Sequence, residues 1–151
     1  ATPASGALAV LVFSGAMALF RLVADRVVAA RGRLVIIRFG PLLSAFGIAI
    51  ALLSPSAELA LIGWFFAGLG ISAVVPQIFA ISAVVGEESH SGRNMATVVG
   101  LCYAGVLGGP AIIGLLTAVM PLHIALTFGI FLGLVIALGS LRLGKALAAK
   151  A

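Results

Sequence analysis

The sequence predicts an all-α fold, a polytopic bundle of about five helices that cross a lipid bilayer. The first observation is composition: 63% of the 151 residues are hydrophobic and only 9% are charged, whereas about a quarter of a soluble domain is charged. The second is five apolar runs, each near the roughly 20 residues that a spanning helix needs. The third is that the basic residues fall on one side when these runs are threaded alternately through a membrane.

Each apolar run is expected to be helical because lipid offers the backbone no hydrogen-bond partners. The links between the runs are short and polar, and the last of them is only Met120-Pro121. Pro121 is well placed to begin a helix. Such links force neighbouring helices to be antiparallel. The expected spans, which make residues 1–151 one partial bundle, are 6–23, 34–53, 59–85, 94–119 and 122–141.

The distribution of basic residues predicts the orientation of the bundle. All nine lie on one side of the threaded chain or at helix ends leading to it, and Glu58 is the only charge on the opposite side. The positive-inside rule makes the basic side cytoplasmic. A multi-pass protein of a bacterial inner membrane is expected, with its C-terminus inside. The basic residues are Arg21, Arg26, Arg31, Arg33, Arg38, Arg93, Arg142, Lys145 and Lys150.

Polar side chains inside the spans are few, and they are the candidates for a substrate-binding surface. Uncharged polar groups at membrane depth face other helices or a water-filled cavity. The candidates are Gln77, Tyr103, Ser72 and Trp64. Hydrogen bonding between helices is the alternative for each. No Asp, Glu, Lys or His lies at the middle of a span, so proton coupling would depend on residues outside this chain.

Glycine and proline mark positions where the helices are expected to bend or to approach closely. Pro76 removes a hydrogen bond from its helix and frees the carbonyl of Ser72. Gly108-Gly109-Pro110 is predicted to be the most flexible point, although static kinks explain these residues equally well. Small residues also recur every four positions in the fourth run, which indicates close helix packing. They are Ala96, Gly100, Ala104 and Gly108.

Several other classes of function fit the sequence poorly. The histidines fall on opposite sides of the membrane and no nucleophile–base set converges, so an enzyme is not expected. No metal-ligand spacing appears, and Cys102 is the only cysteine. No metal or cofactor is therefore expected. The pI is near 10.8, but the basic residues form no stripe with interleaved aromatics, which argues against nucleic acid.

The charged segment after the first run is the most specific motif. It contains Arg21, Leu22, Asp25, Arg26, Arg31, Gly32 and Arg33. Here the chain resembles the major facilitator superfamily, whose loop signature is roughly G-R-L-x-x-D-R followed by a basic residue and glycine. Phe20 stands where that signature has its first glycine. A solvated loop that only sets orientation is the alternative reading.

The resemblance implies a fold and a function. The five spans would correspond to helices eight to twelve of a two-bundle transporter, closest to bacterial sugar-permease-like and drug-efflux-like members. The missing N-terminal bundle of the same protein and a small-molecule substrate are the implied partners, besides the lipid bilayer. Such a secondary active transporter works by alternating access. Its cytoplasmic gate would comprise Arg21, Asp25, Arg26, Arg31, Gly32 and Arg33. A non-transporting membrane scaffold or assembly subunit is the alternative function.

Overall fold

The computed structural model describes residues 3–84 and 91–148, and this part of the chain is built of helices without strands. Five of its stretches are long and apolar enough to cross a membrane. The expectation of an all-α membrane bundle with about five spans is therefore confirmed. The helices are α1 (Pro3–Arg31), α2 (Arg33–Leu53), α3 (Ala57–Ile71), α4 (Val74–Ser82), α5 (Ser91–Thr117) and α6 (Leu122–Ala148).

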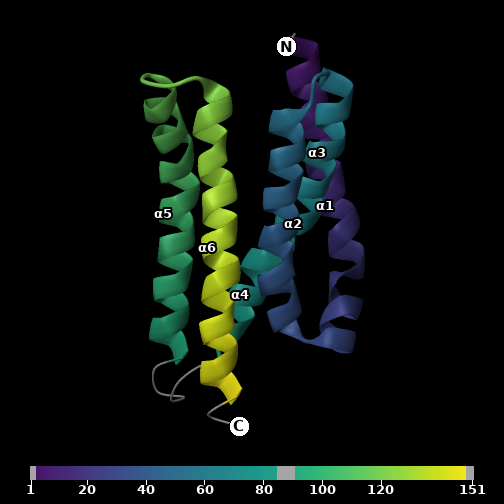
Figure 1. Ribbon diagram of the computed structural model, residues 1–151. Helices are drawn as coiled ribbons and strands as arrows, with labels where there is room; N and C mark the ends of the chain where they lie inside the picture. Colours follow the sequence, from purple (N-terminus) through teal and green to yellow (C-terminus); the bar gives the residue numbers. More distant parts are fainter. Residues whose placement is uncertain (1–2, 85–90, 149–151) are drawn as a thin grey trace.

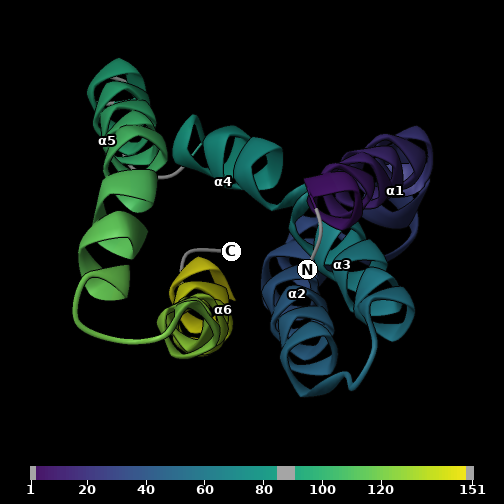
Figure 2. The same cartoon turned by 90° about the horizontal axis from the view of Figure 1, so that it is seen from above.

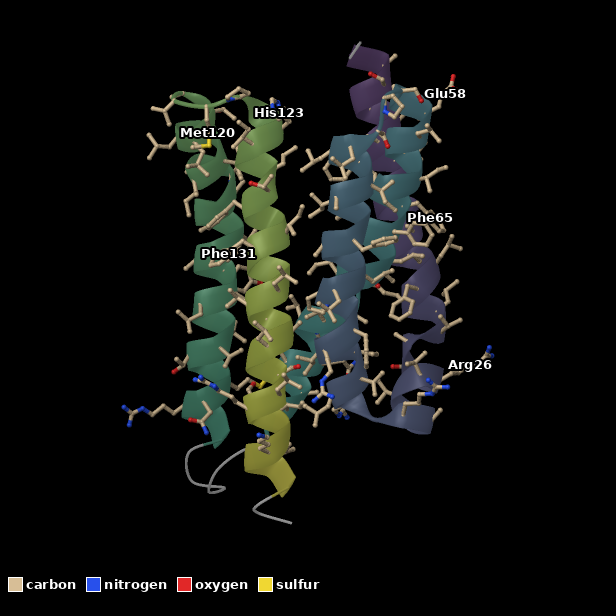
Figure 3. All side chains as sticks on the ribbon, viewed as in Figure 1. Arg26, Glu58, Phe65, Met120, His123 and Phe131 are labelled. Atoms are coloured by element: carbon tan, nitrogen blue, oxygen red, sulfur yellow. The ribbon has the colours of Figure 1, made fainter. Side chains whose placement is uncertain are left out.

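The long helices lie side by side along one direction, and successive spans run in opposite directions (Figure 1). The start of α1 and the end of α6 consequently lie at opposite ends of the bundle. We call the end where α1 gives way to α2 the basic end, because Arg31, Arg33, Arg93 and Lys145 lie there. Glu58, at the start of α3, lies at the other end (Figure 3).

Helix α1 is longer than expected. It continues to Arg31, eight residues beyond the predicted end at residue 23, so the expected loop over 24–33 is reduced to Gly32. Residues 22–31 contain no Gly or Pro and are mostly Ala, Leu, Val and Arg, which a helix accommodates at low cost. Gly32 then reverses the chain with a positive φ of 79°, a conformation that glycine adopts without steric penalty.

The third span is interrupted near its middle. Helix α3 ends at Ile71 and α4 begins at Val74, with Ser72 and Ala73 between them. Pro76 has no N–H, so the carbonyl of Ser72 loses its normal helical partner. Helical bonding resumes where the N–H of Gln77 donates to the carbonyl of Ala73 at 3.3 Å. The bend therefore falls where the proline pattern of the sequence allowed one.

Helices α2 and α3 form the tightest pair in the fold, and glycines make the close approach possible. A Cβ added at Gly47 would lie 2.5 Å from the carbonyl oxygen of Gly63, and one at Gly40 would lie 2.6 Å from that of Gly70. The connection between the two helices is capped by Ser56, whose hydroxyl accepts from the N–H of Leu59 at 3.3 Å. Backbone thus touches backbone along much of this hairpin.

Helix α6 packs mainly against α2, and α1 packs mainly against α3 (Figure 2). A Cβ at Gly133 of α6 would lie 2.8 Å from the carbonyl oxygen of Pro41 on α2. A Cβ at Gly68 of α3 would lie 3.2 Å from that of Ala16 on α1. The buried centre of the described chain therefore surrounds α2 and α3.

Helix α5 stands apart from this centre. It contacts only α4 and α6 among the described elements, and none of its described residues is buried. Added Cβ atoms at its glycines, including Gly100 and Gly108, would meet nothing within 4 Å. The close packing expected for the stripe of small residues on this helix is therefore not made within the described part of the chain.

Candidate functional site

The predicted gate residues lie on the last turns of α1 and at the start of α2. Arg21, Asp25, Arg26 and Arg31 are exposed on α1, and Arg26 points away from the bundle (Figure 3). Helix α1 contacts α2 and α3 but, among the described residues, does not contact α5. The structure therefore brings Asp25 to an exposed helical surface, and its role in a cytoplasmic gate stays a prediction.

One gate candidate and one cavity candidate come together. Arg33 Nη1 donates a hydrogen bond to Gln77 Oε1 at 3.0 Å, which links the start of α2 to α4. Gln77 is only 7% exposed, and a hydrogen bond from a charged donor is stronger than a neutral one. The two residues are 44 positions apart, so nothing in the sequence indicated that they would pair.

Ser72, at the α3–α4 interruption, is the most deeply buried of the cavity candidates. It is 2% exposed, and its hydroxyl has no hydrogen-bond partner. Its carbonyl faces the position where Pro76 supplies no N–H. A buried polar group without a partner is unfavourable, so the interruption concentrates unsatisfied hydrogen-bonding capacity at one place inside the span.

Arg38 is a polar residue within a span that was not among the predicted candidates for a substrate-binding surface. It is half-buried on α2, and its Nε atom is buried without a hydrogen-bond partner. A Cβ at Gly144 of α6 would lie 3.8 Å from Arg38 Nη2, so the side chain runs along the α2–α6 contact. Its position within an apolar run was the available signal, because arginine is costly inside a membrane.

The two aromatic cavity candidates lie elsewhere. Trp64 is half-buried on α3 and packs edge-on against Phe13 of α1, with ring centroids 6.3 Å apart. Tyr103 is on α5 and 65% exposed. The structure thus gathers Ser72 and Gln77 at the α3–α4 junction and does not bring Trp64 or Tyr103 to it.

The predicted flexible points behave differently from one another. Helix α5 continues without interruption through Gly108, Gly109 and Pro110, whereas Pro76 lies three residues after a helix break. Among these positions, only Pro76 lies close to an interruption of its span. Bending at either segment during function stays a prediction.

The residues that the structure describes contain no group of three or more His, Cys, Asp or Glu that could hold a metal ion. Cys102 is a free, half-buried thiol on α5. The arrangement is that of a multi-pass membrane protein that gathers Ser72 and Gln77 at the α3–α4 junction and most of its basic residues at the basic end.

Comparison with known proteins agrees with this class. The chain is 36% identical over 126 residues to an uncharacterized MFS-type transporter of Yersinia pestis, covering 82% of this chain and 32% of that protein. It is 35% identical over 136 residues to the membrane protein MosC of Rhizobium meliloti, covering 89% of this chain and 33% of that protein. It is 31% identical over 130 residues to an uncharacterized transporter of Sinorhizobium fredii, covering 85% of this chain and 34% of that protein.

The chain therefore spans about a third of the length of these curated relatives. No protein-family model matches it, and no solved structure matches it. The chain is related to transporters of the major facilitator type, and the resemblance carried by the charged segment is confirmed.

Proposed function

We propose that this chain is the C-terminal part of a secondary active transporter, which moves a small solute across a membrane by alternating access. The observation that carries the proposal is the 36% identity to an MFS-type transporter over 82% of this chain. The remaining helices would belong to the same protein and would supply the rest of the solute pathway. A coupling ion, if the transport uses a proton, would be bound there, because the spans described here lack a central acidic group.

The α3–α4 junction is the part of this chain that we assign to the solute pathway. Irregular backbone at membrane depth is tolerated only where protein buries it or water lines it. Ser72 offers a free hydroxyl at this junction, and Gln77 carries an amide held by Arg33. We assign the exposed charges on α1 to a gate at the basic end, which the positive-inside rule makes cytoplasmic.

The test is transport by the complete protein with Gln77→Leu. The substitution removes the acceptor for Arg33 and the only side-chain amide at the junction. We expect solute uptake or efflux to fall about tenfold, the scale of losing one hydrogen bond to a charged group. Cells that express the protein would first be screened against sugars and amphiphilic drugs to find a transported solute.

Thr117→Val is the matched control, since Thr117 is exposed at the end of α5 and bonds only within its own helix, to the carbonyl of Gly114 at 2.8 Å. Its transport should equal that of the unaltered protein. Full transport by Gln77→Leu would remove the junction from the pathway. No transport of any solute, together with stable association with another membrane protein, would favour the scaffold alternative.

A further inference from the structure

An apolar groove lies between α1 and α2, with α3 as its floor. Its volume is about 430 Å³. The lining comes from Phe20 and Val27 of α1, from the outward face of α2 and from Leu69 and Gly70 of α3. Every lining side chain is apolar or absent, so a water molecule in the groove would find no side-chain hydrogen-bond partner.

The groove follows from the way the three helices are connected. Helices α1 and α2 are joined by Gly32 alone, yet each packs more extensively on α3 than on the other. They therefore separate above the turn, and Figure 2 shows α3 lying between them. Phe39 and Phe46 of α2, which line the groove, are 57% and 58% exposed. Within the described chain, the groove is consequently open toward the outside of the bundle.

The basic end of the groove can hold an anion. The N-cap position of α2 is Gly32, which provides no side-chain hydrogen bond to the helix. The first backbone N–H groups of α2 thus keep free donor capacity and the positive end of the helix dipole. Val35 and Ile36, in the first turn of the same helix, line the groove. The anion-binding end and the apolar groove therefore adjoin.

Arg31 adds a positive charge at this place. It is exposed and lies four residues after Val27, so the two share one face of α1. Asp25 is two residues before Val27, about 200° around the helix, and so lies on the opposite face. The charge at the mouth of the groove is therefore basic, with an exposed guanidinium that suits a phosphate.

We propose that this groove binds one anionic glycerophospholipid from the leaflet at the basic end. One of its two acyl chains lies between α1 and α2 on α3, and its phosphate contacts Arg31 and the N-terminus of α2. The apolar groove matches the acyl chain of such a lipid, and the adjoining positive charge matches its phosphate. The inference requires that the bundle lies in a membrane with this groove facing lipid, and it does not depend on transport.

The experiment measures lipid retained by the purified complete protein. The protein is incubated with dioleoyl phosphatidylglycerol, and bound lipid is counted by native mass spectrometry, with dioleoyl phosphatidylcholine and chain-free glycerophosphate as comparison ligands. We expect phosphatidylglycerol to be retained over phosphatidylcholine by about fivefold, the scale of one arginine near an anionic lipid. Glycerophosphate should not compete. Equal retention of both lipids, or displacement by glycerophosphate, would overturn the proposal.

Two pairs of variants locate the site. Leu42→Trp fills the groove and should abolish the preference, while Leu132→Trp, on an exposed position of α6, should keep it. Arg31→Gln should reduce phosphatidylglycerol binding about fivefold, while Arg93→Gln, which removes one exposed charge at the same end, should not. Val35→Phe serves as a second groove-filling variant if Leu42→Trp does not elute as a single species. Unchanged binding in the groove-filled protein, or equal loss in both arginine variants, would overturn the assignment.

Discussion

At Gly47, a single added carbon atom is expected to push two helices apart. A Cβ there would lie 2.5 Å from the carbonyl oxygen of Gly63 and would also meet the backbone nitrogen of Ala67. Backbone atoms cannot rotate away as a side chain does. We expect Gly47→Ala to lower the free energy of unfolding by about 1–3 kcal/mol, measured as reduced thermal stability of the complete protein in one fixed detergent.

Gly15→Ala is the control for that change. Gly15 lies inside α1, and a Cβ at this position would meet nothing within 4 Å. Alanine is the better helix former by about 1 kcal/mol, so stability should stay constant or rise. Equal losses at both positions would show that the α2–α3 contact is not the cause.

The hydrogen bond between Arg33 and Gln77 could not be predicted from the sequence. Both residues were candidates, one for a gate and one for a cavity. Their hydrogen bond depends on α4 lying beside the start of α2, which is a property of tertiary packing. The deep burial of Ser72 and the exposure of Tyr103 likewise depend on which helices lie next to each residue, since both residues occur in apolar stretches of sequence.

Among the elements, the interrupted third span is the one whose shape depends on a single residue. Pro76→Ala supplies an N–H that can donate to the carbonyl of Ser72, and we expect α3 and α4 to become more continuous. Backbone amides at residues 74–78 should then exchange with solvent about fivefold more slowly, the effect of about one added hydrogen bond. Hydrogen–deuterium exchange of the complete protein, read by mass spectrometry, measures this.

Pro110→Ala provides the comparison, since α5 is already continuous through Pro110. Its substitution should leave exchange at residues 74–78 unchanged. Slower exchange at that segment in both variants, or in neither, would contradict the link between Pro76 and the interruption. The pair also separates the two bending points that the sequence suggested.

The existence of the spans was predictable, but the end of α1 was not. Apolar length and the absence of lipid-compatible alternatives to helix fix the number of spans. The charged residues from Asp25 to Arg31 suggested a loop, yet charge is compatible with a helix that extends past the hydrocarbon region. At 1.5 Å per residue, the 29 residues of α1 reach about 43 Å, beyond the roughly 30 Å hydrocarbon core.

For the whole molecule, the separation of charge between the two ends predicts a topology. Glu58 lies at one end and the arginines of α1, α2 and α5 lie at the other. In a Cys102→Ser background, we expect a membrane-impermeant maleimide applied to intact cells to label Ser56→Cys and not Gly92→Cys. Both positions are exposed.

Permeabilised cells should show labelling at both positions, which controls for reactivity. Labelling of Gly92→Cys alone in intact cells would place the basic end outside. Labelling of both would contradict the transmembrane separation of the two ends.

The arrangement of α5 shows how far the sequence describes the whole molecule. Its small residues predicted close packing, but within the described chain their face meets no neighbour. Small side chains indicate that another helix can approach closely. Which helix approaches depends on what else surrounds α5. The chain matches about a third of its relatives' length.

The glycine contacts between α2 and α3 also bear on how the protein is made. The two helices are joined by residues 54–56 and touch through backbone atoms, so their mutual recognition requires no distant part of the chain. Such a unit can leave the translocation machinery as a preassembled hairpin. We expect it to be the earliest folding intermediate during synthesis, onto which α1 and α6 then dock.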